Sequence, residues 1–204
     1  MLLDKKITAL CSIASKEEGR PILQSIKLAN SKAITTDGFR LLEIELPKWE
    51  GYQEELPSTG HDPLVNDEPY LILASELKKA LDMIPKKSTL PILGYAWTAK
   101  SSMENTVKIV STDLSTLNAP EIRLVEGSFP ETEKVKPTGK SVFEISVNAV
   151  LLAELLTAMV KAGAGENSNN PVKLKFYLDK PIMLEAATQD KRKITGLLMP
   201  VRET

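Results

Sequence analysis

A pattern of apolar residues recurs three times along the chain, at intervals of about seventy residues. In each copy, apolar side chains stand at positions 0, 3, 4 and 7, which places them on one face of a helix. The three stripes are Ile7, Leu10, Cys11 and Ala14; Leu77, Ala80, Leu81 and Ile84; and Leu152, Leu155, Leu156 and Met159. Each such helix must bury its apolar face, so the repeat predicts three similar units, each with one helix lying on a sheet.

Other features repeat with the stripes. A residue able to cap a helix precedes each of them: Asp4, Ser75 and Asn148. In the first two copies the string Pro-Ile-Leu follows fourteen residues after the start of the stripe, at 21–23 and 91–93. A Thr-Asp pair follows each Pro-Ile-Leu, at 36–37 and 112–113. These coincidences indicate that the repeat is real.

Strand-like segments surround each expected helix. Leading strands are expected at 70–74 and 141–146, and strands after the third helix at 172–178 and 182–187. Each unit is therefore expected to be a strand, a helix and two or three further strands. Sequential antiparallel strands on one side, with helices on the other, make an α+β architecture.

Two polar, turn-rich stretches separate the units. The segment 47–69 contains four prolines and two glycines, and a second connector covers 131–140. The third copy also carries a Gly- and Asn-rich insertion at 163–170. We place the unit boundaries in the two connectors.

The composition is that of a globular protein without a secretory signal. The formal net charge is −1, so any basic surface that binds nucleic acid must be local. Cys11 is the only cysteine and cannot form an internal disulfide. No apolar run is long enough for a membrane span, and the N-terminal residues do not have the pattern of a signal peptide. These features predict a cytoplasmic protein that does not associate with membranes.

The sequence offers no constellation for catalysis. His61 is the only histidine, and it lies in the proline-rich connector without a nucleophile motif around it. Asp37 and Asp113 occupy equivalent positions of the repeat, which indicates a role in turns and not a paired acid and base. No phosphate-binding glycine loop or metal-ligand spacing occurs. We expect a protein that is not an enzyme and needs no metal or cofactor.

Four strings resemble a known family. They are LPILG at 90–94 with TDL at 112–114, TTDGFRL at 35–41, GSFPETEKVKP at 127–137 and GLLMPVRET at 196–204. These strings are similar to those of the bacterial DNA sliding clamps, the beta subunits of DNA polymerase III. The resemblance implies the DNA-clamp fold of repeated βαβββ units, two per domain and three domains per chain. Residues 1–136 resemble a complete clamp domain, and residues 137–204 resemble a single unit of the last domain.

The departures from the family pattern are specific. The chain has three units where a clamp has six, and the unit expected between the two parts is absent. Phe39 stands where the family has histidine, and Pro21 and Ile22 stand where DNA-contacting clamps have an aromatic pair.

The resemblance implies a cleft that binds a short apolar peptide of a partner protein. Met and aliphatic side chains suit such a pocket, and arginines at its rim suit carbonyl or carboxylate groups. The implied lining is Leu23, Thr36, Gly38, Phe39, Arg40, Leu41, Pro130, Val135, Leu198, Met199, Pro200, Val201 and Arg202. The alternative is that the aliphatic residues belong to the core and that Asp37-Gly38 is only a hairpin turn.

The resemblance also implies contact between helix lysines and the phosphates of duplex DNA, without sequence readout. The candidates are Lys5, Lys6, Arg20, Lys78, Lys79, Lys86, Lys87 and Lys161. The alternative is an ordinary solvated helix face, diluted by acids such as Glu76.

The expected function is that of a sliding-clamp-like processivity factor in DNA replication. It would be a non-catalytic platform that binds short motifs of DNA polymerase or repair proteins, encircles double-stranded DNA and forms a homo-oligomer. The alternative is a clamp-derived adaptor or regulator that binds clamp-binding peptides without encircling DNA.

Overall fold

The computed structural model describes residues 1–29, 31–48, 57, 59–61, 63–64, 68–86, 90–165, 171–177 and 180–201. The chain divides into two compact units, Met1–Lys136 (unit 1) and Pro137–Thr204 (unit 2).

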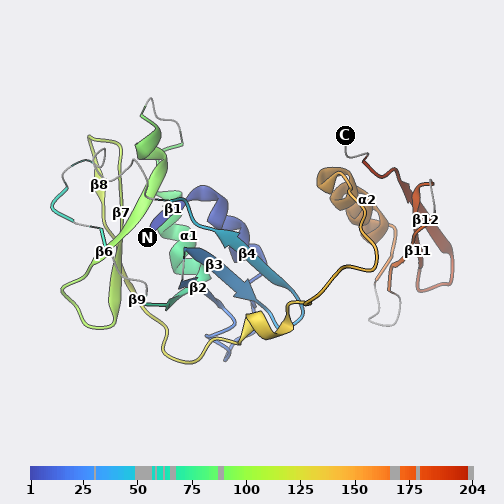
Figure 1. Ribbon diagram of the computed structural model, residues 1–204, viewed down its shortest axis with the longest axis horizontal. Coiled ribbons are helices and arrows are strands. Elements are labelled where there is room, and N and C mark those ends of the chain that lie inside the picture. Colours follow the sequence, from blue (N-terminus) through green and yellow to red (C-terminus); the bar gives the residue numbers. More distant parts are fainter. Residues whose placement is uncertain are drawn as a thin grey trace. The chain divides into compact units, whose positions relative to one another are not determined.

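Unit 1 consists of two similar halves and a connector (Figure 1). The first half contains β1 (Leu2–Asp4), η1 (Lys5–Ser12), β2 (Ser25–Ala29), β3 (Lys32–Thr36) and β4 (Leu41–Glu45). The second contains β5 (Tyr70–Leu73), α1 (Ala74–Asp82), η2 (Pro91–Gly94), β6 (Tyr95–Lys100), β7 (Thr106–Thr112), β8 (Leu117–Asn118) and β9 (Glu121–Arg123). A short helical turn, η3 (Thr132–Val135), follows in the connector.

The two halves of unit 1 exchange their opening strands. One sheet has the order β4-β3-β2-β5, and the other has the order β1-β6-β7-β8 with β9 also paired to β7. Thus β1 pairs with β6 of the second half, and β5 pairs with β2 of the first half, both antiparallel. Each sheet is complete only when the other half contributes its strand.

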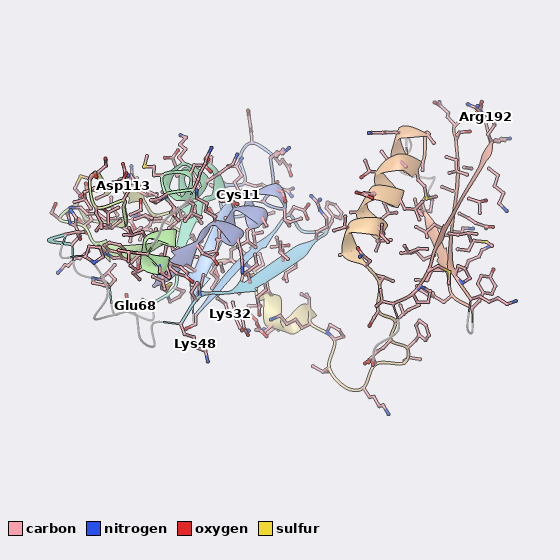
Figure 2. All side chains as sticks on the ribbon, turned by 90° about the horizontal axis from the view of Figure 1, so that it is seen from above. Cys11, Lys32, Lys48, Glu68, Asp113 and Arg192 are labelled. Carbon is pink, nitrogen blue, oxygen red and sulfur yellow. The ribbon has the colours of Figure 1, made fainter. Side chains whose placement is uncertain are left out.

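The predicted apolar stripes of unit 1 form its main core. Ile7, Leu10, Leu77 and Leu81 are all fully buried, together with residues of both sheets. The helices η1 and α1 meet at Cys11 (Figure 2), whose Sγ donates a hydrogen bond to the carbonyl oxygen of Ala74 at 3.3 Å. Burial raises the pKa of the Cys11 thiol. The stripe prediction is confirmed, although the first helix is a 3-10 helix.

A second, smaller cluster lies on the other face of the first sheet. Phe129 packs there against Ile34 and Leu71, and the backbone N–H of Val125 donates to the carbonyl oxygen of Leu71 at 2.9 Å. Gly127 has a φ of +136°, and a Cβ there would lie 2.6 Å from Cδ1 of Ile22. A side chain at this position would be strained in this backbone conformation and would displace the end of the Ile22 side chain, so glycine is favoured where the chain enters the connector.

Unit 2 contains α2 (Ala149–Lys161) and a sheet of three antiparallel strands. These are β10 (Lys173–Lys175), β11 (Ile182–Ala187) and β12 (Lys193–Leu198), in the order β10-β11-β12. Met159 of α2 packs with Leu184 and Leu198 of the sheet. A Cβ on Gly196 would lie 3.0 Å from Leu155, so this strand approaches the helix closely. The α+β prediction, with antiparallel sheets and few helices, is confirmed.

Two local predictions are wrong. The segment 141–146 forms no strand. In unit 1 the leading strands pair with the opposite half, and no such half stands beside β10 among the described residues of unit 2. Ser75 is not an N-cap, because α1 begins directly after β5 with Leu73 at that position and no side-chain cap. Asp4 and Asn148 do cap their helices: Asp4 accepts the backbone N–H of Lys6, and Asn148 accepts those of Val150 and Leu151.

Candidate partner-binding site

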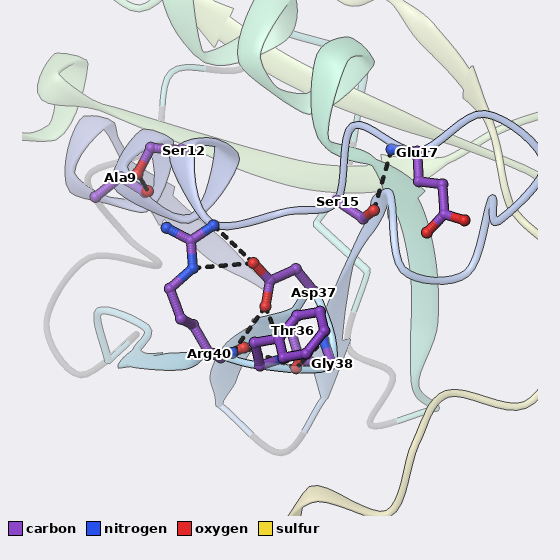
Figure 3. A network of polar contacts seen from close by, with 9 residues as sticks. Ala9, Ser12, Ser15, Glu17, Thr36, Asp37, Gly38 and Arg40 are labelled. Atoms are coloured by element: carbon purple, nitrogen blue, oxygen red, sulfur yellow. Dashed lines mark hydrogen bonds and ion pairs between the residues drawn. The ribbon is translucent and has the colours of Figure 1, made fainter. Parts of the chain in front are cut away.

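The turn between β3 and β4 is built around one carboxylate. Oδ1 of Asp37 accepts the backbone N–H groups of Phe39 and Arg40 at 2.9 and 2.7 Å. Oδ2 accepts Nε and Nη2 of Arg40 at 2.9 and 2.6 Å (Figure 3). This fork fixes the turn and leaves other N–H groups of Arg40 for further contacts.

The residues around Asp37 complete the turn. Oγ1 of Thr36 donates to the carbonyl oxygen of Arg40 at 2.7 Å and accepts the N–H of Gly38 at 3.1 Å. Gly38 has a φ of +92°, a region that favours glycine. These hydrogen bonds fix the conformation of the loop, and the loop holds Phe39 in solvent, with 97% of this residue exposed.

The bonds to Arg40, and those from the backbone N–H groups, lower the pKa of Asp37 to about 2. We expect a carbon-13 NMR titration of the folded protein to show this midpoint. The folded value lies below the ordinary 3.8, so the contribution to stability is present above that pH and is lost as the pH falls through about 2. Replacing Arg40 by glutamine should raise the midpoint part of the way towards 3.8, since the backbone bonds remain. An unchanged midpoint in that variant would show that Arg40 does not hold the carboxylate.

The same turn recurs between β7 and β8. Oδ1 of Asp113 accepts the backbone N–H groups of Ser115 and Thr116 at 3.0 and 2.6 Å. Thr112 repeats the role of Thr36, donating to the carbonyl oxygen of Thr116 at 2.8 Å. The geometry confirms that both aspartates serve turns. Ser115 and Thr116 stand at the positions of Phe39 and Arg40, so the aromatic ring and the guanidinium group are specific to the first turn.

Two further candidates lie near β4. Leu41 begins this strand and is 37% exposed, and Val135 in η3 is 74% exposed. Glu43, two residues after Leu41 and on the same face of the strand, accepts Nζ of Lys136 at 2.5 Å and Nζ of Lys32 at 2.6 Å. The bond to Lys136, and then that to Lys32, lower the pKa of Glu43. The first ion pair holds the end of η3 beside β4, a link that the sequence strings did not reveal.

The remaining candidates of unit 1 differ in exposure. Leu23 is half-buried, and its carbonyl oxygen accepts the N–H of Ser15 at 2.9 Å. Thr36 is buried, whereas Gly38 and Pro130 are exposed. The structure therefore supports neither a purely core role nor a fully open position for Leu23.

In unit 2 the candidates lie at the end of β12 and just beyond it. Leu198 is 6% exposed and belongs to the core of the unit, which fits the core alternative for this residue. Met199 and Val201 are 67% and 50% exposed, and Pro200 is half-buried. The N–H of Val201 donates to the carbonyl oxygen of Ser146 at 2.8 Å. Arg202 lies outside the described residues.

Most of the basic candidates are exposed, and some are paired. Arg20 forms an ion pair with Glu17 at 3.3 Å, and Lys79 forms one with Glu76 at 2.8 Å. Lys6, Lys78, Lys86 and Lys161 are exposed and Lys5 is half-exposed, while Lys87 lies outside the described residues. The acids thus neutralise part of the expected basic surface.

The sequence did not reveal one further lysine that lies beside the candidate DNA-binding residues. Lys16 and Lys78 both line a shallow hollow of about 290 Å³ between the end of η1 and the start of α1. Lys16 follows the first apolar stripe and carries no motif of its own. Only the contact between the two helices brings it towards Lys78.

Two classes of site are absent from the described part of the chain. No cluster of His, Cys, Asp or Glu side chains that could hold a metal ion occurs there. None of its helices combines the length and the apolarity needed to cross a bilayer.

The fold is that of the bacterial DNA sliding clamps, as the strings in the sequence had indicated. The beta subunit of the DNA polymerase of Streptococcus pyogenes matches with a TM-score of 0.68 at 18% identity, over 99% of this chain and 50% of that chain. The sliding clamp of Bacillus subtilis matches with a TM-score of 0.69 at 16% identity, over 98% and 48%. The pol III beta of Caulobacter crescentus matches with a TM-score of 0.64 at 17% identity, over 100% of this chain and 51% of that chain.

The chain therefore spans about half the length of these clamps. Neither a protein-family model nor a curated protein sequence matches it.

Proposed function

We propose that this protein is a non-catalytic, clamp-like platform that binds short apolar motifs of replication or repair proteins, DNA polymerase among them. The observation that carries the proposal is Phe39. A large aromatic side chain is held almost fully in solvent by a turn that hydrogen bonds of Thr36 and Asp37 fix in shape. Exposed aromatic anchors on rigid supports are typical of residues that dominate binding energy.

Further exposed apolar side chains support this role. Leu41 and Val135 lie near the turn in unit 1, and Met199 and Val201 follow the last strand of unit 2. Flexible methionine and aliphatic groups adapt to different partner side chains. We propose that these side chains bind apolar residues of partner motifs, and that the N–H groups of Arg40 not bonded to Asp37 bind carbonyl groups of the partner.

Duplex DNA is the second proposed partner. Lys6 and Lys78 on the helices of unit 1, with Lys16 beside the hollow, supply charges for phosphate contacts that carry no sequence information. The matched clamps are about twice as long as this chain, so encircling DNA would need more than one copy. The alternative is an adaptor that binds partner motifs and does not encircle DNA.

The test is a pair of binding measurements on the full chain. A fluorescent synthetic peptide with the clamp-binding motif of a bacterial replicative polymerase should bind with a dissociation constant of about 1–100 μM, as short tethering motifs do. Labelled duplex DNA at low salt should bind independently of sequence and weaken steeply as salt rises. Peptide binding without DNA binding would favour the adaptor. Absence of peptide binding at millimolar concentration would overturn the platform.

A further inference from the structure

Unit 2 exposes apolar side chains on three of its parts. The segment before α2 carries Val142 and Phe143, which are 104% and 61% exposed. The edge strand β10 and the residues after it carry Leu174 and Phe176, which are 50% and 47% exposed. The helix α2 adds Val150, Leu151 and Val160, all more than half exposed. Exposed apolar surface beside an open sheet edge is typical of an interface.

Unit 1 shows how the same three parts are covered when two halves meet. The leading strand β1 pairs with β6 of the other half, β5 pairs with β2, and the helices η1 and α1 pack together. Each leading strand thus closes the sheet edge of its opposite half. In unit 2 the equivalent parts are present once, and the segment 141–146 is not in a strand.

We propose that two copies of this chain associate through unit 2 and together complete one clamp-like domain. Each copy adds residues 142–147 as a strand to the open edge of β10 of the other copy, and the two α2 helices pack against each other. The arrangement is twofold symmetric, so each contact occurs twice. The occupant of the exposed edge is a second copy because this chain contains the strand and the helix that the edge lacks.

Unit 1 also indicates a pairing register. Asp4 and Asn148 cap equivalent helices, so Ser146 corresponds to Leu2, which pairs with Trp97. Trp97 pairs with Val110, on the sheet face turned away from the main core. Lys173 and Lys175 lie on the equivalent face of β10, and we take Lys173, which pairs with Glu185, as the counterpart of Trp97. Ser146 of one copy should therefore lie opposite Lys173 of the other.

This register matches the chemistry of the two segments. On the helix face, Ile145 falls opposite Leu174, and Phe143 falls opposite Phe176. On the outer face, Glu144 falls opposite Lys175, an opposite-charge pair. A slip of one residue in either direction would place Glu144 against Leu174 or Phe176, so the alternation of the two segments keeps the apolar side chains on the helix face.

The contacts within one copy allow this exchange. The rings of Phe143 and Phe176 already meet within the chain, at a centroid distance of 5.4 Å, so the same contact can form between copies. Lys175 pairs with Glu185 at 2.5 Å, but Glu185 also has Lys193 at 2.9 Å. Lys175 can therefore turn to Glu144 of the second copy while Glu185 keeps a cation.

The test uses two separate chains, each with one introduced cysteine in a Cys11→Ser background. One carries Glu144→Cys and the other Lys175→Cys. Mixed and oxidised, they should form a disulfide-linked dimer, and no single chain can close this bond within itself. The matched control replaces Glu144→Cys by Lys140→Cys, which lies about 13 Å out of register along the strand. No linked dimer, or equal linkage with the control, would overturn the proposal.

A measurement of association completes the test. Sedimentation of the unmodified chain should show a dimer at concentrations of about 10–100 μM. Glu144→Lys should weaken the dimer about tenfold, because two like-charge contacts replace two attractive ones. A monomer at the highest concentration, or a dimer unaffected by this change, would contradict the proposed interface. Peptide binding through Phe39 does not enter this experiment, so the platform proposal and the dimer proposal can fail separately.

Discussion

Replacing Leu77 by alanine is expected to lower the free energy of unfolding of unit 1 by about 3 kcal/mol. Leu77 is fully buried in the core that both halves of the unit share. The substitution removes apolar contacts and leaves a cavity, because the exchanged strands β1 and β5 hold the surrounding sheets in place. Urea unfolding, followed by circular dichroism, should show a lower midpoint with an unchanged slope.

The control for this prediction is Leu117→Ala in β8. Leu117 is 44% exposed, so its truncation should cost less than about 1 kcal/mol. Because the halves exchange strands, both should unfold together in one transition of unit 1. Equal losses for the two variants, or a separate early transition of the half that contains α1, would contradict this account of the core.

The helices were predictable because their information is local. The stripes at Leu77 and Leu152 depend only on helical spacing, and their buried faces follow directly. The prediction of a strand at 141–146 is wrong because a strand forms only beside a partner strand, and the periodicity of a segment does not show whether that partner is present. The prediction that Ser75 caps α1 is wrong for a related reason. The helix starts directly where β5 ends, so the end of the strand sets the first residue of the helix and the capping preference of Ser75 does not.

The candidate site divides in the same way. The repeated Thr-Asp pairs predicted the turn roles of Asp37 and Asp113, because hydrogen bonding within a turn is local. The exposure of Phe39 could not be read from its apolar character, which equally suits a core residue. Leu198 shows the opposite outcome, since this aliphatic candidate lies in the core of unit 2. The ion pair between Lys136 and Glu43 joins residues far apart in sequence and left no local signal.

Phe39→Ala is expected to weaken binding of the clamp-motif peptide by roughly ten- to a hundredfold, the effect typical of an aromatic anchor. The thermal midpoint should not change, because Phe39 is 97% exposed and contributes little to the core. Fluorescence polarisation with the labelled peptide measures the first quantity, and calorimetry measures the second. Met103→Ala, at a residue 54% exposed in the β6–β7 turn, is the matched control and should leave both unchanged.

The neighbouring variant Arg40→Ala distinguishes the contribution of the Phe39 ring from that of the hydrogen bonds that fix the turn. It removes the fork to Asp37 but leaves the aromatic ring in place, so peptide binding should fall while the pKa of Asp37 rises towards its ordinary value. In Phe39→Ala that pKa should stay near 2, since the backbone N–H groups and Arg40 remain. If Phe39→Ala bound the peptide as well as the unmodified chain, the exposed ring would not be the anchor. The motif would then have to be held by Leu41 and Val135 or by the segment after β12, each of which can be truncated in the same assay.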